Sequence, residues 1–272
     1  MIIGKAISPF ALRKKSSGGG GGNDPDAQLF ITATGISGTN ATATNQLVID
    51  LKAANIWTKM KAIYPFVGGT SAFTHKFNLK DPRDLNAAYR LAFFGGGTFS
   101  ANGYQPNASN VFADTFLIPL TDLTLNSQHI SFYSRTNSNG TEVEIGCNAG
   151  GVAPNTLLEI RTAGSTYSSV ATGTYLSYVD ANSLGLYIGN RTASNVTNLF
   201  KNNTKVATGT TASTINPSSS IAICALNSGT VRQYYSSKQC AFSSIGDGLT
   251  DAEALAFYNA VQTFNTTLGR QV

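Results

Sequence analysis

Apolar residues recur at helical spacing near the two ends of the chain and at every second position in between. The first helical stretch begins at Asp24, which can cap a helix, and continues with Pro25, which suits a first helical position. Gly35 follows the last apolar residues of this stretch and is typical of a helix end. The pattern therefore predicts a first helix over residues 24–34.

A second helix is predicted to begin after a cap at Thr44 or Asn45 and to end at Pro65. Its apolar face is formed by Leu47, Val48, Leu51, Ala54, Ile56, Trp57 and Met60. We interpret residues 24–65 as a small helical collar with more apolar surface than it can bury alone. We therefore expect a homo-oligomer, a dimer or a trimer, with contacts through Leu47, Leu51, Trp57 and Met60.

After Pro65 the apolar period changes to two, which is typical of strands. Strands are predicted over residues 87–93, 129–135, 141–147, 156–162, 173–179, 184–190, 196–208, 220–226 and 239–245. Gly, Asn, Ser and Pro fill the gaps, and Asn202-Asn203 is a candidate hairpin turn because asparagine tolerates positive φ. With no helices between the strands, the pattern favours an antiparallel sandwich.

The last segment returns to helical spacing. Thr250 and Glu253 form a capping box, and Gly269 ends the predicted helix. Its apolar face consists of Phe257, Val261, Phe264 and Leu268. The expected fold is therefore mainly β: an antiparallel sandwich over residues 66–272 with a C-terminal helix, preceded by the helical collar and by an extended N-terminal arm.

Residues 1–23 form this arm, and their composition sets them apart. Five consecutive glycines, 18–22, are typical of a flexible tether. The arm holds four of the 19 basic residues and none of the 14 acidic ones, so the rest of the chain carries a net charge of only +1. We expect the arm to dock into a larger assembly through Ile2, Ile3, Ile7, Phe10, Leu12, Arg13, Lys14 and Lys15. The near-neutral body argues against nucleic acid as a partner.

The sequence gives little support for a metal or cofactor site, for paired cysteines, for secretion or for membrane insertion. The two histidines, His75 and His129, are far apart and lack metal-ligand spacing, so we expect no metal site and no cofactor. The three cysteines have no C-x-x-C spacing, and we interpret them as reduced, buried residues of a chain made in a cytoplasm. There is no secretion signal at the start and no run of eighteen apolar residues, so we expect no membrane insertion.

Two segments carry a resemblance to a known fold. The ending CAFSSIGDGLTDAEALAFYNAV resembles the close of concanavalin-A-like (laminin-G-like) jelly-roll domains, and NLFKNNTKVATGT resembles a hairpin of the same domains. The resemblance covers roughly residues 66–272 and implies a jelly-roll sandwich. Domains of this fold include lectins and glycan hydrolases, so the fold does not decide between binding and cleavage.

A second resemblance spans nearly the whole chain. The arm, the segments NDPDAQLFITATGI, LVIDLKAANIWTKMKAIYPFVGG and HKFNLKDPRDLNAAYRLAF, and the C-terminal tail are together similar to a virion-protein family of tailed phages of gut bacteria, including crAss-like phages. This resemblance implies a structural protein of the virion, a head-fibre or tail-appendage component. It also implies that the arm docks into another virion protein.

The residues themselves favour binding over catalysis. Retaining hydrolases of this shape carry a motif resembling E-x-D-x-x-E, whereas here Glu142 and Glu144 are followed by Cys147 at the third carboxylate position. We interpret these two glutamates as solvated residues on an outer face and expect no catalytic residues. The alternatives are a glycan-cleaving virion enzyme and a purely structural decoration protein.

Host-surface polysaccharide is the further candidate partner. Tyrosines in loops and strands can stack on sugar rings, although at least half of them are expected to pack within the sheets. We take Tyr104, Tyr167, Tyr234 and Tyr235 as the candidate glycan-binding residues.

Overall fold

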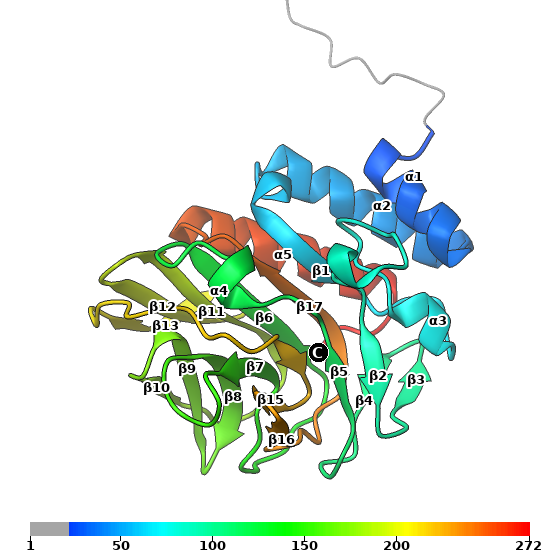
Figure 1. Ribbon diagram of the computed structural model, residues 1–272. Helices are drawn as coiled ribbons and strands as arrows, with labels where there is room; N and C mark the ends of the chain where they lie inside the picture. The colour runs from blue at the N-terminus through cyan, green and yellow to red at the C-terminus, as the bar shows by residue number, and fades with distance from the viewer. Residues whose placement is uncertain (1–21) are drawn as a thin grey trace, which may run out of the picture.

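A computed structural model describes residues 22–272. The docking residues predicted for the arm lie outside this range. Two large sheets stack face to face, and the longer helices lie along one outer face of the stack (Figure 1). The predicted mainly β antiparallel sandwich with a C-terminal helix is therefore confirmed.

The first sheet has eight strands, and β1 (Met60–Tyr64) joins it by pairing with β17. Along the sheet the other strands are β13 (Thr204–Gly209), β12 (Val196–Lys201), β11 (Gly185–Ala193), β6 (Gln128–Ser134), β17 (Cys240–Gly246), β4 (Gly103–Gln105) and β3 (Thr98–Ser100). All neighbours in it are antiparallel. The predicted hairpin turn is confirmed, because Asn202 has a φ of 55° between β12 and β13.

The second sheet has nine strands. Along the sheet seven of them are β10 (Leu176–Val179), β9 (Ser165–Thr172), β8 (Asn155–Thr162), β7 (Ile145–Asn148), β14 (Ala222–Ile223), β5 (Phe112–Asp114) and β2 (Ala92–Phe94). The other two are β15 (Leu226–Ser228), which pairs in parallel with β7, and β16 (Val231–Gln233), which pairs with β15. The 141–147 strand was predicted too long, because regular pairing begins only at Ile145.

The helices are α1 (Pro25–Thr34), α2 (Gly38–Ala53), α3 (Ala72–His75), α4 (Pro119–Asp122) and α5 (Asp251–Thr267), with short 3₁₀ turns η1 (Trp57–Lys59) and η2 (Asn86–Ala88). Helix α5 begins with the predicted capping box, in which the Thr250 hydroxyl accepts from the Glu253 amide. Helices α2 and α5 pack together over the first sheet (Figure 1). Strands β6 and β17 are consequently buried along their whole length.

The collar differs from its prediction. Helix α2 begins at Gly38, before the expected cap, and ends at Ala53, before Asn55 takes a φ of 58°. The residues predicted to continue the helix instead form η1 and β1, and β1 is a strand of the first sheet. A separate helical unit over residues 24–65 is therefore wrong, because part of it belongs to the sandwich.

The four predicted oligomer contacts are buried within the chain. They join the apolar cluster that α2 and α5 form with the first sheet, and their exposed fractions are 1% for Leu47, 0% for Leu51, 6% for Trp57 and 2% for Met60. The apolar face that suggested a second copy is covered by α5 and the sheet. Any contact with another copy would have to use other residues.

Candidate functional site

The two glutamates predicted to be solvated are instead buried around a lysine. Glu144 is fully buried and Glu142 is 9% exposed. The Lys238 ammonium, itself fully buried, donates to Glu142 Oε2 at 2.8 Å and to Glu144 Oε1 at 3.1 Å. The prediction is wrong because strand alternation places the two glutamates on one face but does not say what covers that face.

Serine hydroxyls and a backbone amide complete this buried ionic cluster. Ser236 donates to Glu144 at 3.2 Å, and Ser237 donates to Glu142 at 3.0 Å. The amide of Ile160 donates to the other oxygen of Glu144. Burial raises the pKa of Glu144 to about 7. Burial also acts to raise the pKa of Glu142, but the hydrogen bonds from Lys238 and Ser237 and the charge of Lys238 together lower it.

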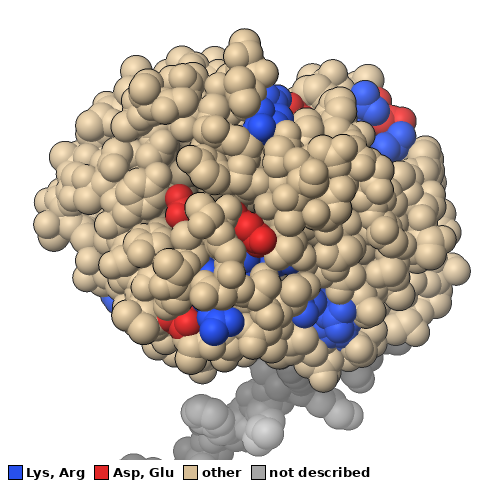
Figure 2. All heavy atoms as spheres, turned by 90° about the horizontal axis from the view of Figure 1, so that it is seen from below, with Lys and Arg blue, Asp and Glu red and all other residues tan. Residues whose placement is uncertain are grey.

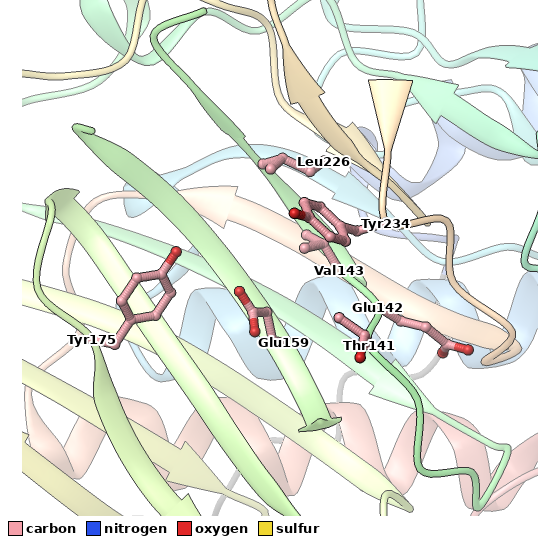
Figure 3. Close-up of a pocket in the computed structure, with 7 residues that line it drawn as sticks. All are labelled: Thr141, Glu142, Val143, Glu159, Tyr175, Leu226 and Tyr234. Atoms are coloured by element: carbon pink, nitrogen blue, oxygen red, sulfur yellow. The ribbon is translucent and has the colours of Figure 1, made fainter. Parts of the chain in front are cut away.

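The segment that carries these glutamates also forms one wall of a surface hollow of about 220 Å³. The hollow is lined by Thr141, Glu142, Val143, Glu159, Tyr175, Leu226 and Tyr234 (Figure 3). Glu159 lies between Tyr175 on one side and Tyr234 with Val143 on the other, while the Glu142 carboxylate is directed away from Glu159 (Figure 3). The hollow therefore presents one free carboxylate between two tyrosines.

Strand register explains why these side chains meet. On β8, Leu158 and Ile160 face the core between the sheets, so Leu157 and Glu159 face outward. Glu159 is paired with Tyr167 on β9. Leu157 packs with Val143 and Leu226 in a small apolar cluster, which gives the hollow an apolar floor.

The two tyrosines that line the hollow, Tyr175 and Tyr234, differ in their contacts and in their backbone conformation. Tyr175 is 42% exposed; its hydroxyl accepts from Asn155 Nδ2 at 3.2 Å, and its ring meets Tyr167 edge to face at 6.3 Å. Tyr234 is 48% exposed and has a φ of 54°, in the left-handed region that a bulky residue rarely adopts. The surrounding structure thus holds Tyr234 in a strained backbone conformation, which Phe66, Tyr89 and Phe116 also adopt elsewhere in the chain.

Glu159 has no ion pair and no hydrogen bond to its carboxylate within residues 22–272. Burial raises the pKa of Glu159. A half-buried carboxylate that can only accept hydrogen bonds is ready to bind donors from a ligand.

The four tyrosines predicted to bind glycans lie in different places in the structure. Tyr234 lines the hollow, and Tyr167 lies beside it against Tyr175. Tyr104 is wrong as a glycan contact, because its ring is fully buried and its hydroxyl donates to the Phe112 carbonyl at 3.1 Å. Tyr235 contacts Phe112 and does not line the hollow.

Sequence reasoning missed Glu159 and did not select Tyr175 among the sugar contacts. The available signal was an acidic residue at an outward position of strand 156–162, where Arg161 is the one other charged residue.

Neither histidine is placed to bind a metal with other ligands. His75 and His129 are both buried; His75 contacts the Gly69 carbonyl, and His129 contacts the Asp247 carbonyl and Ser244. No group of three or more His, Cys, Asp or Glu side chains suited to a metal ion is found in the part of the chain from residue 22 onward.

The cysteines Cys147, Cys224 and Cys240 are buried and unpaired.

Among the helices described for residues 22–272, none combines the length and the apolar character that crossing a membrane requires.

Comparison with known proteins finds no matching family model and no matching curated protein. Solved structures with similar folds include the NanB sialidase of Streptococcus pneumoniae, with a TM-score of 0.43 and 15% identity over 59% of this chain and 27% of that chain. Domain 4 of AbnA, an arabinanase from Geobacillus stearothermophilus in complex with arabinotriose, matches with a TM-score of 0.46 and 13% identity over 73% and 98% of the two chains. A Trypanosoma rangeli sialidase mutant matches with a TM-score of 0.49 and 10% identity over 81% and 39%. This chain thus spans about a quarter of the NanB chain.

Proposed function

We propose that this chain is a non-enzymatic virion protein whose β-sandwich attaches the particle to glycans on the host surface, while its N-terminal arm docks into another virion protein. The observation that carries the glycan-binding part is the hollow, in which Glu159 lies between two exposed tyrosines over an apolar floor. The virion part rests on the sequence resemblance and on the composition of the arm.

The chemistry of the hollow suits a sugar. The exposed rings of Tyr175 and Tyr234 offer apolar faces for the C–H side of a pyranose, while the Glu159 carboxylate and the Thr141 hydroxyl can take up its hydroxyl groups. At about 220 Å³ the hollow is smaller than the ~300–1,000 Å³ typical of buried small-molecule sites. This size supports recognition of one or two sugar units of a chain that otherwise remains in solvent.

The surroundings of the hollow support binding without cleavage. Glycoside hydrolysis in most families uses two carboxyl groups that face each other across the scissile bond. Here Glu142 is turned away from Glu159 and is bound to Lys238. Charged side chains are also few and scattered on the lower side of the molecule, where uncharged side chains prevail (Figure 2).

Adsorption of the full-length protein to host cells, with and without their capsule, tests the glycan-binding proposal. Tyr234→Ala should reduce binding about fivefold or more, because stacking on an aromatic ring contributes about 1–3 kcal/mol. The matched control is Phe94→Ala, which removes an aromatic side chain of similar exposure, 47% against 48%, outside the hollow. Binding that does not depend on the capsule, or that both variants reduce equally, would contradict the proposal.

The other two parts of the proposal have separate tests. A chain that begins at Asp24 should be incorporated into particles far less efficiently than the full chain, since it lacks the docking arm. Incorporation at the same level would contradict docking through the arm. New reducing ends in host capsule incubated with the protein, lost in Glu159→Gln, would show cleavage and overturn the non-enzymatic part.

A further inference from the structure

The charge of the hollow is set by a single side chain. Two of its lining residues are acidic, but Glu142 is bound to Lys238. No lysine or arginine is among the lining residues. The nearest basic residue along β8, Arg161, donates to Asn137 Oδ1 at 3.0 Å outside the hollow. The Glu159 carboxylate therefore faces a ligand without a neighbouring cation.

Resting on the proposed function, we propose that the hollow selects saccharides that bring hydrogen-bond donors to Glu159, namely neutral or amino sugars, and rejects saccharides that carry carboxylate, sulfate or phosphate groups. Glu159 is thus the specificity-determining residue of the site. Tyr175 and Tyr234 stack on the sugar ring, whereas Glu159 determines which sugars bind.

Elementary electrostatics give this selection its direction. An ionised carboxylate only accepts hydrogen bonds, so two adjacent hydroxyls of a neutral sugar, or an ammonium group, can satisfy both of its oxygens with charge-assisted bonds. An acidic sugar in the same place would bring two negative charges within a few ångströms of each other. Because Glu159 is half-buried, solvent screens this repulsion less than it would on an open surface.

Matched pairs of oligosaccharides test the proposal. Each pair consists of a neutral hexose oligomer and the uronic acid oligomer of the same linkage and length, and gluco, galacto and manno series are compared on immobilised full-length protein. In the series that binds best, the neutral member should bind at least about tenfold more tightly than its acidic partner, because like charges at close range oppose binding.

Glu159→Gln sharpens the test, because glutamine keeps the shape and an acceptor oxygen but removes the charge. This variant should bring the neutral-to-acidic ratio to within about threefold, mainly by improving binding of the acidic member. The matched control is Asp251→Asn, which makes the same change of net charge at an exposed carboxylate paired with Lys205. The control should keep the ratio of the unmodified protein.

The outcomes distinguish this inference from the proposed function. Equal or tighter binding of the acidic member by the unmodified protein overturns the inference but leaves glycan binding standing. A ratio that Glu159→Gln leaves unchanged overturns the role of Glu159. Binding of no pair overturns the inference. If adsorption to host cells is also independent of the capsule, the proposed function falls with it.

Discussion

Helices α2 and α5 cover the outer face of the eight-stranded sheet (Figure 1). The outer face of the nine-stranded sheet, in contrast, is open at the hollow (Figure 3). Under the helices, strands β6 and β17 are buried on both faces. At the hollow, Glu159 and Tyr167 on neighbouring strands remain only half-buried. The same sandwich thus has one face that is packed like a core and one that presents polar and aromatic side chains to solvent.

This difference separates stability from binding. The covered face joins Leu47, Trp57 and Phe257 in one large apolar cluster, and burial of such side chains is the main favourable term in folding. The floor of the hollow holds only the three-residue cluster of Val143, Leu157 and Leu226. Substitutions on the covered face should therefore change stability, while those in the hollow should change binding with little effect on stability.

The largest expected effect on stability lies on the covered side, at Arg270. This arginine is 1% exposed and donates to the carbonyls of Pro65, Phe66 and Ala241 at 2.6–2.8 Å. Arg270→Ala should lower the free energy of unfolding by about 3–5 kcal/mol, because it leaves several buried carbonyls without donors. Urea denaturation measures the loss.

The matched control for this prediction is Arg83→Ala. Arg83 forms a surface pair with Asp81, and the median contribution of such pairs is about 0–1 kcal/mol. A loss below about 1 kcal/mol for Arg270→Ala would contradict the view that this side carries the stability.

The second-largest expected effect on stability lies at the buried ionic cluster beneath the open face. It tests the contrast between the two faces, because a substitution beside the hollow is here expected to change stability as well as binding. Lys238→Met should cost about 3 kcal/mol in urea denaturation, because it leaves Glu142 and Glu144 buried without their cation. It should also weaken glycan binding, since these glutamates flank Val143 in the wall of the hollow. Lys205→Met, at an exposed surface pair, is the control and should change neither quantity. If Lys238→Met were as stable as the unmodified protein, the wall of the hollow would not depend on the ion pairs of Lys238 with Glu142 and Glu144.

A smaller effect concerns the pH dependence of stability at the same cluster. Burial raises the pKa of Glu144 to about 7 in the folded protein, above its ordinary value of 4.5. Between these values the folded state holds more protons than the unfolded state, so this group's contribution to stability falls as pH rises from about 4.5 to 7. The slope for one proton is at most about 1.4 kcal/mol per pH unit.

The change Glu144→Gln checks this dependence. Urea midpoints at several pH values between 5 and 8 should decline with pH more steeply for the unmodified protein than for the variant, which lacks the titrating group. Parallel curves for the two proteins would contradict a raised pKa at Glu144.

Local signals predicted the parts of this fold that depend on neighbours in sequence. The capping box at Thr250 and the turn at Asn202 are formed by residues within a few positions, and both are confirmed. Met60 was misassigned to a helix because its strand pairs with Gly246, far along the chain. Helical spacing near Met60 could not reveal a partner at that distance.

The candidate site could be predicted only in part for the same reason. Tyr234 was selected from its residue type, and it lines the hollow. The burial of Glu144 depends on Lys238, a residue 94 positions away, and alternation along one strand gives no sign of it. Tyr104 was misjudged in the same way, because its loop-like surroundings hide that it lies in the core between the two sheets.

The smallest expected effect on stability, and the sharpest contrast between stability and binding, lies at Tyr234. Because its φ of 54° suits glycine better than tyrosine, Tyr234→Gly should leave the free energy of unfolding unchanged or raise it by up to about 1 kcal/mol, while glycan binding is lost. The control is Val179→Gly in strand β10, an 82% exposed residue that is not among those with positive φ, where glycine should cost about 0.5–1 kcal/mol and binding should persist. Urea denaturation and adsorption to host cells measure the two quantities. A clear loss of stability in Tyr234→Gly would mean that the ring supports the fold. Retained stability with lost binding would mean that the protein tolerates backbone strain at this position in order to present the ring to a ligand.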